Sequence, residues 1–226
     1  MGYLGYKPAD KPLTSADITD SIITSAKITD ATIVNGDIAN ATIALAKLSA
    51  TGTPSAATFL RGDNSWGSAG ATAGQVIQVV STTKTDYLAI SATTTFTDIT
   101  GLSVSITPSS TSNKILILGN ISCGGDGGGR LAFRLVKTST AISIGDTAGS
   151  RPRATVGATS SLSVNDQINA SFNFLDSPAT TSSTTYKVQY ISEGGAAING
   201  SQGNLDANSV GNSRTVSTIT VMEIKG

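Results

Sequence analysis

The chain has 226 residues and a formal net charge of zero, and only 13% of its residues are charged, against about 25% in ordinary globular domains. This balance offers no basic surface for nucleic acid or for an anionic membrane, so neither is expected as a partner. A hydrophobic fraction of 38%, rich in β-branched residues, excludes a disordered chain and predicts an all-β protein.

The sequence contains no histidine and a single cysteine, Cys123. Nucleophilic catalysis that depends on histidine is therefore excluded, as is an intrachain disulfide framework, and a zinc site is not expected. Thirteen aspartates leave a carboxylate-pair glycoside hydrolase open, but they are scattered singly, often in turn sequences. We expect no enzymatic activity, no cofactor and no metal.

Residues 1–13 form a short leader with two prolines and no periodicity, so an extended segment is expected. Its apolar side chains have no core to join within so short a piece. Two interpretations stay open: a frayed tail, or a peptide that becomes ordered on a partner through Tyr3, Leu4, Tyr6 and Pro8. No secretion signal and no membrane span is predicted, which favours a chain made in the cytoplasm without membrane insertion.

Residues 14–50 carry an isoleucine or leucine at every fifth position. On an α-helix, a step of five separates successive side chains by about 140°, and on a strand it alternates between the two faces. The spacing is explained if the chain turns a corner about every five residues and directs one apolar side chain inward per side. The predicted apolar core of this repeat is Ile18, Ile23, Ile28, Ile33, Ile38, Ile43 and Leu48.

A small residue lies two positions before each of these side chains, from Ala16 to Ala46, which resembles the pentapeptide-repeat pattern. A superposed period of ten resembles the repeats in shafts of bacteriophage tail fibres. It is set by Asp17, Lys27, Asp37 and Lys47. If each coil of a square solenoid takes four pentads, seven pentads make fewer than two coils. A free-standing solenoid needs roughly three or more stacked units to bury a continuous core. An oligomeric shaft is the preferred interpretation, and a monomeric β-helix is the alternative.

Residues 51–74 form a connector of small residues with three apolar anchors, Phe59, Leu60 and Trp66. The segment also contains Arg-Gly-Asp at 61–63. That tripeptide is an integrin-binding motif, but turn chemistry before Trp66 explains it better. The sequence TGTPSAATFLRGDNSWG resembles a connector common in bacteriophage tail fibre proteins, of the form GTPS-x-x-TFLRGD-x-x-W.

Residues 75–226 show the alternation of apolar and polar residues that is typical of half-buried strands, for example at 102–107, 130–135, 167–174 and 185–190. Turn sequences separate these runs, so the region is predicted to be a β-sandwich, with a jelly-roll as the expected topology. Residues 115–118 are continuously apolar, which predicts a strand covered on both faces. The last strand, around 216–224, is apolar on both faces as well, which is expected if one side contacts a neighbouring chain.

Three stretches are candidate ligand sites. The glycine-rich run at 124–129 lacks the Lys-Ser/Thr pair of a phosphate-binding loop, so a strand connection is expected instead. Arg151 and Arg153 could grip an anionic sugar or a phosphate, although exposed arginines more often only solvate a loop. The amide-rich loop at 199–212 suits a hydroxylated ligand. Its candidate residues are Asn199, Gln202, Asn204 and Asn208.

Together, the leader, the repeat, the connector and the β-domain resemble the layout of a tailed-bacteriophage virion fibre. The resemblance implies a structural, homotrimeric fibre component, attached to other virion proteins of the head or tail by residues 1–13 and exposed on the particle surface. The alternative is a receptor-binding tip that recognises host-surface glycan. A carboxylate-dependent depolymerase is the third hypothesis.

Overall fold

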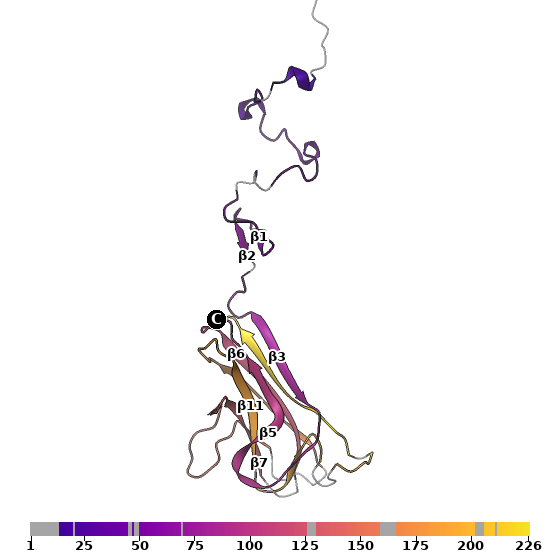
Figure 1. The fold of residues 1–226 in the computed structure, drawn as a ribbon, viewed down its shortest axis with the longest axis vertical. Helices are drawn as coiled ribbons and strands as arrows, with labels where there is room; N and C mark the ends of the chain where they lie inside the picture. Colours follow the sequence, from indigo (N-terminus) through magenta and orange to yellow (C-terminus); the bar gives the residue numbers. More distant parts are fainter. Residues whose placement is uncertain are drawn as a thin grey trace, which may run out of the picture. The chain divides into compact units, whose positions relative to one another are not determined.

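The structure is a computed structural model that describes residues 14–19, 21–44, 47, 50–68, 70–125, 130–158, 166–201, 206–210 and 212–226. The chain divides into two compact units, Met1–Ala69 and Gly70–Gly226. The first unit consists of short turns and a small hairpin, and the second holds the long strands (Figure 1). We call residues 14–50 the repeat and the second unit the β-domain.

The described part of the first unit contains three complete single turns of 3₁₀ helix and one two-stranded hairpin. Each 3₁₀ turn is three residues long and is followed by an extended isoleucine. The elements are η1 (Ser15–Asp17), η2 (Ser25–Lys27), η3 (Asn35–Asp37), β1 (Thr58–Leu60) and β2 (Trp66–Ser68).

The tripeptide from Arg61 to Asp63 forms the turn of this hairpin, as the sequence predicts. The Asn64 amide donates a hydrogen bond to the Arg61 carbonyl at 3.0 Å, and Asn64 takes a positive φ of 62°. The Asp63 carboxylate accepts hydrogen bonds from the Ser65 amide at 3.0 Å and from the Ser65 hydroxyl at 2.6 Å. The Arg61 guanidinium donates to the Ser68 carbonyl at 3.0 Å. Both charged side chains of the motif therefore brace the hairpin.

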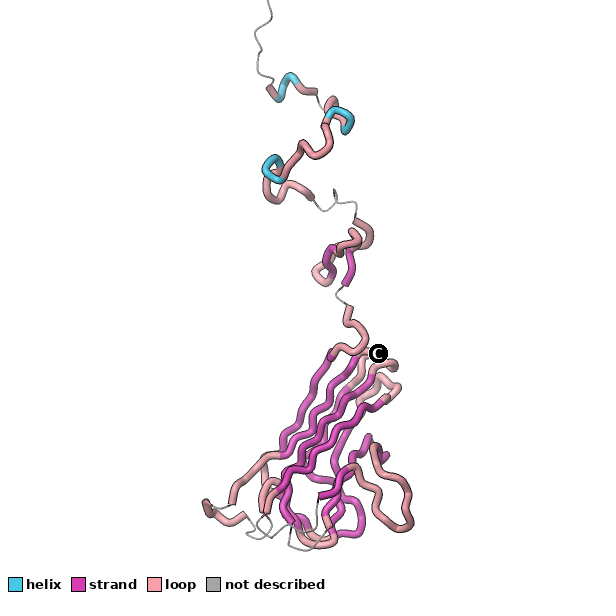
Figure 2. The backbone as a smooth tube through the Cα atoms, turned by 180° about the vertical axis from the view of Figure 1, so that it is seen from behind, coloured by secondary structure: helices cyan, strands magenta, loops and turns pink. Residues whose placement is uncertain are grey.

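The first sheet of the β-domain has β6 at its centre, with β10 on one side and β13 followed by β3 on the other. All of these neighbours are antiparallel, and the long strands run side by side in Figure 2. The short strands β12 and β4 extend the sheet beyond the far end of β6. The bounds are β3 (Val76–Lys84), β4 (Leu88–Ile90), β6 (Lys114–Gly125), β10 (Ile168–Asp176), β12 (Ala196–Ile198) and β13 (Ser217–Ile224).

The second sheet is also antiparallel, in the order β5, β11, β7. Two short strands, β8 and β9, pair with different parts of the outer edge of β7. The bounds are β5 (Thr93–Ile106), β7 (Leu131–Lys137), β8 (Thr140–Ile142), β9 (Val156–Ala158) and β11 (Thr184–Ser192).

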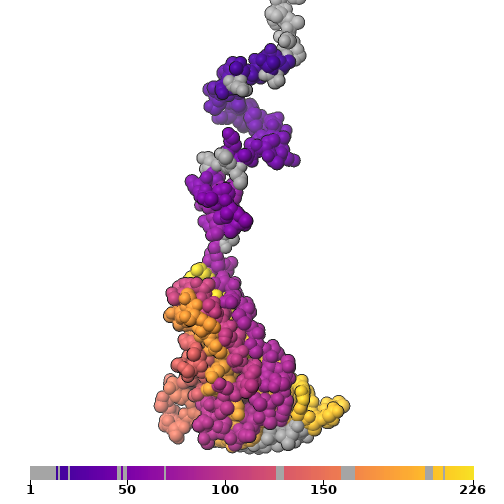
Figure 3. All heavy atoms as spheres, viewed as in Figure 1, coloured from indigo at the N-terminus to yellow at the C-terminus, as the bar shows by residue number. Residues whose placement is uncertain are grey.

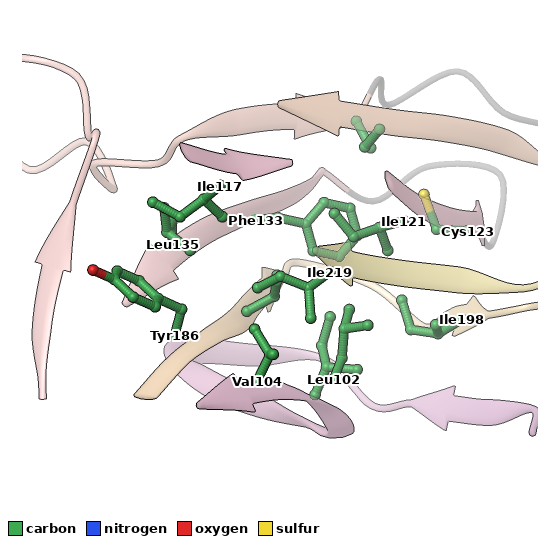
Figure 4. Close-up of a cluster of buried hydrophobic side chains, with 14 of the residues drawn as sticks. Leu102, Val104, Ile117, Ile121, Cys123, Phe133, Leu135, Tyr186, Ile198 and Ile219 are labelled. Carbon is green, nitrogen blue, oxygen red and sulfur yellow. The ribbon is translucent and has the colours of Figure 1, made fainter. Parts of the chain in front are cut away.

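The two sheets pack face to face over one apolar core, which confirms the all-β prediction and the sandwich (Figure 4). The inward positions are those that the period-two pattern indicates, with side chains of β5, β6, β7, β11 and β13 fully or almost fully buried. Phe172 lies over Gly119 of the neighbouring strand so closely that any side chain at Gly119 would collide with the ring. Burial raises the pKa of the Cys123 thiol to about 12, so this cysteine behaves as a small apolar side chain.

Two buried carboxylates are tied by hydrogen bonds at the same end of the sandwich as the start of β3. Glu223 accepts hydrogen bonds from the Ser109 amide at 2.6 Å, the Ser109 hydroxyl at 2.8 Å and the Asn113 side-chain amide at 2.6 Å. Asp176 accepts one from the Tyr186 hydroxyl at 2.7 Å and forms an ion pair with Lys137 at 3.0 Å. Each carboxylate at this end of the core thus has hydrogen-bond donors, and Asp176 has a cation as well.

The residues just before β3 are hydrogen-bonded to a residue just after β13. The Gly74 amide donates to the Lys225 carbonyl at 2.8 Å, and the Lys225 amide donates to the Gln75 carbonyl at 2.8 Å. The chain end marked C in Figure 1 accordingly lies beside the start of β3. The Gly226 amide adds a bond to Asn113 at 3.1 Å.

Candidate functional site

The repeat turns at every fifth residue. Backbone hydrogen bonds from the amide of residue i+3 to the carbonyl of residue i recur for i equal to 14, 19, 24, 29, 34, 39 and 44, at 2.8–3.3 Å. Among the described residues between 14 and 47, every hydrogen bond joins residues three or five apart. The turns are therefore local, and isolated turns of this length are marginal in water.

Two kinds of turn alternate, which gives the backbone a period of ten. One kind is the 3₁₀ turn of η1, η2 and η3, and the other contains a residue with positive φ. Those residues are Ser21, Ala31 and Ala41, with φ of 68°, 65° and 63°. Each such conformation costs about 1–2 kcal/mol for a residue with a side chain, and it persists where neighbouring structure enforces it.

Asp17 and Lys27, which set the superposed period in the sequence, hold successive 3₁₀ turns in different ways. The Asp17 carboxylate accepts hydrogen bonds from the Thr14 amide at 2.8 Å and the Thr14 hydroxyl at 2.6 Å, and these bonds lower the pKa of Asp17. Asp37 accepts in the same way from the Val34 amide at 2.9 Å. Lys27 instead donates its ammonium to the Ile22 carbonyl at 2.6 Å.

The isoleucines of the repeat are exposed in the single chain. Ile18, Ile28 and Ile38 are 40–42% exposed, and Ile23, Ile33 and Ile43 are 53–55% exposed, so their environment repeats every ten residues as the backbone does. Leu48 lies outside the described residues. Nothing within the described part of the first unit covers these side chains. Their burial would contribute a favourable free energy of about 25 cal/mol for each Å² of apolar surface removed from water.

The β-domain carries a second apolar surface of exposed and half-buried side chains, which we call the apolar band: Val76, Ile77, Val79, Leu116, Leu118, Leu175, Met222 and Ile224. Strand register joins four of these side chains into one row on the outer face of the first sheet. Leu175 pairs with Leu116, Leu116 with Met222, and Met222 with Val79. The row therefore crosses four strands.

The band ends abruptly toward the far end of the sheet. The next row is mixed, with Asn173 beside Leu118 and then Thr220 beside Ser81. The row after that is polar throughout and contains a hydrogen bond of 2.8 Å from Ser171 to Asn120. The apolar side chains of this outer face are therefore concentrated at one end of the sheet and the polar ones at the other.

The band corrects one expectation from the sequence. The run at 115–118 predicts a strand covered on both faces, but only Ile115 and Ile117 are buried in the single chain. Leu116 and Leu118 point outward, and Leu118 is 39% exposed. The alternation of inward and outward side chains is present, and among the described residues the outward apolar side chains are only half-buried at Leu116 and exposed at Leu118.

The amide-rich loop divides into a buried and an exposed part. Asn199 has no exposed surface; its side-chain amide donates to the carbonyls of Lys84 at 2.8 Å and Asp86 at 3.0 Å, and its side-chain oxygen accepts from the Ser217 hydroxyl at 2.7 Å. These bonds hold Asn199 at a positive φ of 63° and join strands of the first sheet. Its amide is thus engaged within the chain, and not presented to a ligand.

Asn208 is exposed and lines a shallow hollow that also contains Asp206 and Arg214, which form an ion pair. Gln202 and Asn204 lie outside the described residues, as do the leader residues Tyr3, Leu4, Tyr6 and Pro8. The structure thus brings none of the four predicted loop residues together into a site that it describes.

The described residues contain no group of three or more Asp, Glu or Cys side chains that could hold a metal ion. None of the described helical segments is long and apolar enough to cross a membrane.

Comparisons with known proteins give little to transfer. No family model matches the chain, and no curated protein matches it. Among solved structures, the chain is similar to particles of infectious bursal disease virus. One is the Gx strain, at 15% identity and a TM-score of 0.36, covering 69% of this chain and 44% of that one. Another is the VP2 subviral particle, at 14% identity and a TM-score of 0.36, and this match covers 66% of this chain and 38% of the viral chain. The chain thus spans less than half of these viral chains, and TM-scores of this size transfer neither fold nor function.

Proposed function

We propose that this chain is a structural, homotrimeric fibre component of a tailed-bacteriophage virion. The repeat forms the stalk, the β-domain trimerises beyond it, and residues 1–13 attach the fibre to head or tail proteins through Tyr3, Leu4, Tyr6 and Pro8. The protein is located on the particle surface. The resemblance of the repeat and connector sequences to phage tail fibres supports the choice of particle and the number three.

The observation that carries the proposal is the exposure of six isoleucines on a regular backbone. A regular repeat with positive φ at Ala31 and Ala41, held by local bonds alone, needs neighbouring structure to enforce it. Further copies of the same chain supply that structure, because identical repeats present isoleucines at matching intervals. Burial of these side chains between copies removes their apolar surface from water, which stabilises the oligomer.

The apolar band gives the β-domain its own contact with the other copies. The band begins at Val76, where the chain passes from the connector into β3, and it continues through the end of β13. A trimer that forms along the repeat brings three β-domains to the same assembly. The band is the apolar surface that they would bury there.

The role is structural and not catalytic. The chain has no histidine, and the described aspartates with short contacts serve turns or ion pairs, as Asp63 and Asp176 do. Incubation of the full chain with host capsule or lipopolysaccharide is expected to release no reducing ends. A measurable release would establish a depolymerase in its place.

The oligomer is tested on the full chain by sedimentation velocity and native mass spectrometry. We expect a trimer for the unaltered chain, and monomer for the triple variant Ile28→Asp, Ile33→Asp, Ile38→Asp. The matched control is Thr24→Asp, Thr29→Asp, Asn40→Asp, which adds the same charge at exposed polar positions of the repeat and keeps the trimer. A monomeric unaltered chain contradicts the proposal.

The β-domain contact is tested separately by Val79→Asp with Leu175→Asp in the full chain. We expect a trimer whose β-domains come apart, seen as a larger Stokes radius at unchanged mass. Thr83→Asp, on the polar part of the same outer face, is the control. The location is tested by gold-labelled antibody on intact particles, with and without residues 1–13. Label that persists on particles after this deletion would remove the leader from the proposal.

A further inference from the structure

A groove crosses the outer face of the second sheet. It consists of two adjoining hollows of about 360 Å³ and 640 Å³, which share Thr94, Ser150, Pro152 and Ile191 along their border. The floor comes from β5, β7 and β11, and one wall is the loop of residues 143–155 between β8 and β9. That loop forms the salmon-coloured projection at the lower left of the β-domain in Figure 3. We call this the arginine groove.

The arginine groove contains most of the arginines of the chain. The sequence has six arginines, and four of them line the two hollows: Arg130, Arg134, Arg151 and Arg153. Glu193 is the single acidic residue among those that line the two hollows, and it forms an exposed ion pair of 3.5 Å with Arg130. In a chain with zero net charge, this face is therefore locally basic.

Arg134 is positioned on the floor by its neighbours. Its guanidinium lies over the Phe96 ring, 4.0 Å from the centroid, and its Nε donates to the Gln189 side-chain oxygen at 2.8 Å. Gln189 in turn donates to Asp98 at 2.6 Å, and Asp98 forms an ion pair with Lys187 at 2.7 Å. A guanidinium fixed in its plane loses less entropy when it binds a carboxylate or a phosphate.

The wall is fastened at both ends. The Gly145 amide donates to the Ala154 carbonyl at 3.2 Å, and Arg153 Nε donates to the Gly145 carbonyl at 2.6 Å, which closes the loop on itself. Thr155 then ties the loop to β7, because its amide donates to the Phe133 carbonyl at 2.8 Å and its hydroxyl accepts from the Leu135 amide at 2.9 Å. The side chain of Arg153 is thereby held by its bond to Gly145, and the backbone of the loop places the exposed Arg151 on the same wall.

The remaining lining suits a sugar. Thr93, Thr94 and Ser150 supply hydroxyl groups, and Ala132, Pro152 and Ile191 supply apolar surface for the C–H faces of a ring. Binding sites of this kind combine a mostly apolar lining with a few polar groups that fix orientation. Arginine binds planar anions through two parallel hydrogen bonds, which adds selection for charge.

We propose that the arginine groove binds an acidic saccharide, with the anionic groups on Arg134 and the loop arginines and the sugar rings on the neutral lining. Such a saccharide carries carboxylate or phosphate groups, and a guanidinium binds either anion through two parallel hydrogen bonds. The site gives the chain a receptor-binding function in addition to its structural one. It lies entirely within the β-domain and does not depend on the trimer.

Binding is tested by titration calorimetry on the full chain, with oligogalacturonate as the acidic probe and a maltodextrin of equal length as the neutral one. We expect saturable binding of oligogalacturonate, weakened by added salt, and none of maltodextrin. Arg134→Gln and the double variant Arg151→Gln, Arg153→Gln should each weaken binding about tenfold or more, because one charge-assisted contact is worth about that factor. Lys47→Gln with Lys114→Gln removes two exposed charges elsewhere and is expected to leave affinity unchanged.

Competition by glucose 1-phosphate against galacturonate then distinguishes a phosphate-bearing from a carboxylate-bearing ligand. Arg130→Gln and Arg151→Gln concern exposed side chains, so they keep the test valid if Arg134→Gln fails to fold. Equal binding of the neutral probe, absence of acidic binding at millimolar concentration, or unchanged affinity in the arginine variants would overturn the proposal. Sedimentation of the same samples measures trimer formation independently of saccharide binding. A failure of the trimer proposal can therefore be distinguished from a failure of the saccharide-binding proposal.

Discussion

The repeat and the β-domain stabilise their backbones by different means. In the described part of the repeat, each hydrogen bond joins residues three or five apart, and the isoleucines stay exposed. In the β-domain, strands distant in sequence pair along their whole length, as β3 does with β13, and the apolar side chains meet in one core. The difference shows that the same β-branched composition can give a fold with a buried core in one region and a regular backbone with exposed apolar side chains in another.

Removal of a core side chain gives the largest expected effect. Phe133→Ala deletes a fully buried ring and should lower the free energy of unfolding of the β-domain by about 3–5 kcal/mol. Ile28→Ala in the repeat should leave that free energy unchanged and act on the oligomer alone. Urea denaturation of the full chain, followed by the fluorescence of the β-domain tyrosines, checks both. A similar loss in the two variants would abolish the distinction between the regions.

Loss of a buried amide should have the next largest effect. Asn199→Ala leaves the carbonyls of Lys84 and Asp86 and the hydroxyl of Ser217 without their partner, which should cost about 1–3 kcal/mol. Asn208→Ala, in the exposed part of the same loop, should change stability by less than about 0.5 kcal/mol. The thermal unfolding midpoints of the two variants make the comparison, and equal midpoints would contradict the structural role of Asn199.

Acid should weaken the β-domain through Glu223. Burial alone would raise the pKa of Glu223, but hydrogen bonds from Asn113 and Ser109 outweigh it and bring the pKa below its ordinary value of 4.5. Because the folded carboxyl binds its proton less readily than the unfolded one, its contribution is complete above pH 4.5 and is lost as the pH falls through the lower folded pKa. Unfolding midpoints measured from pH 7 to pH 3 should fall less steeply in Glu223→Gln.

The smallest effect is expected at the caps of the repeat. Asp17→Ala removes the acceptor for the Thr14 amide and should fray one turn, while the unfolding of the β-domain stays the same. Faster hydrogen exchange at the Thr14 amide, measured by NMR, is the expected sign. Exchange that accelerates at turns further along the repeat would show cooperation that local bonds do not provide.

The sequence predicts the parts of this fold that depend on local spacing. The step from Ile18 to Ile43 predicts a turn every five residues, and alternation at Leu131, Phe133 and Leu135 predicts an inward face. Neither pattern contains the register between strands far apart in sequence. The row from Leu175 to Val79 therefore could not be predicted, although the apolar outer face of the last strand pointed toward a neighbour.

The candidate sites were harder to predict for the same reason. Arg151 and Arg153 lie two residues apart in sequence and are conspicuous there, but Arg134 and Arg130 reach the same groove only through the pairing of β7 with its neighbours. Asn199 shows the opposite case. An amide within a run of asparagine and glycine suggests ligand binding, whereas its carbonyl partners Lys84 and Asp86 are more than 100 residues away. The sequence alone does not distinguish a buried asparagine such as Asn199 from an exposed one such as Asn208.

The bonds between Gly74, Gln75 and Lys225 have a consequence for how such a protein evolves. The segment before β3 and the segment after β13 are hydrogen-bonded to each other, so the two ends of the sandwich lie side by side, and such a domain can be transferred between chains without stretching either connection. Exchange of the β-domain would leave the described turns of the repeat as they are, because their hydrogen bonds join residues only three or five apart.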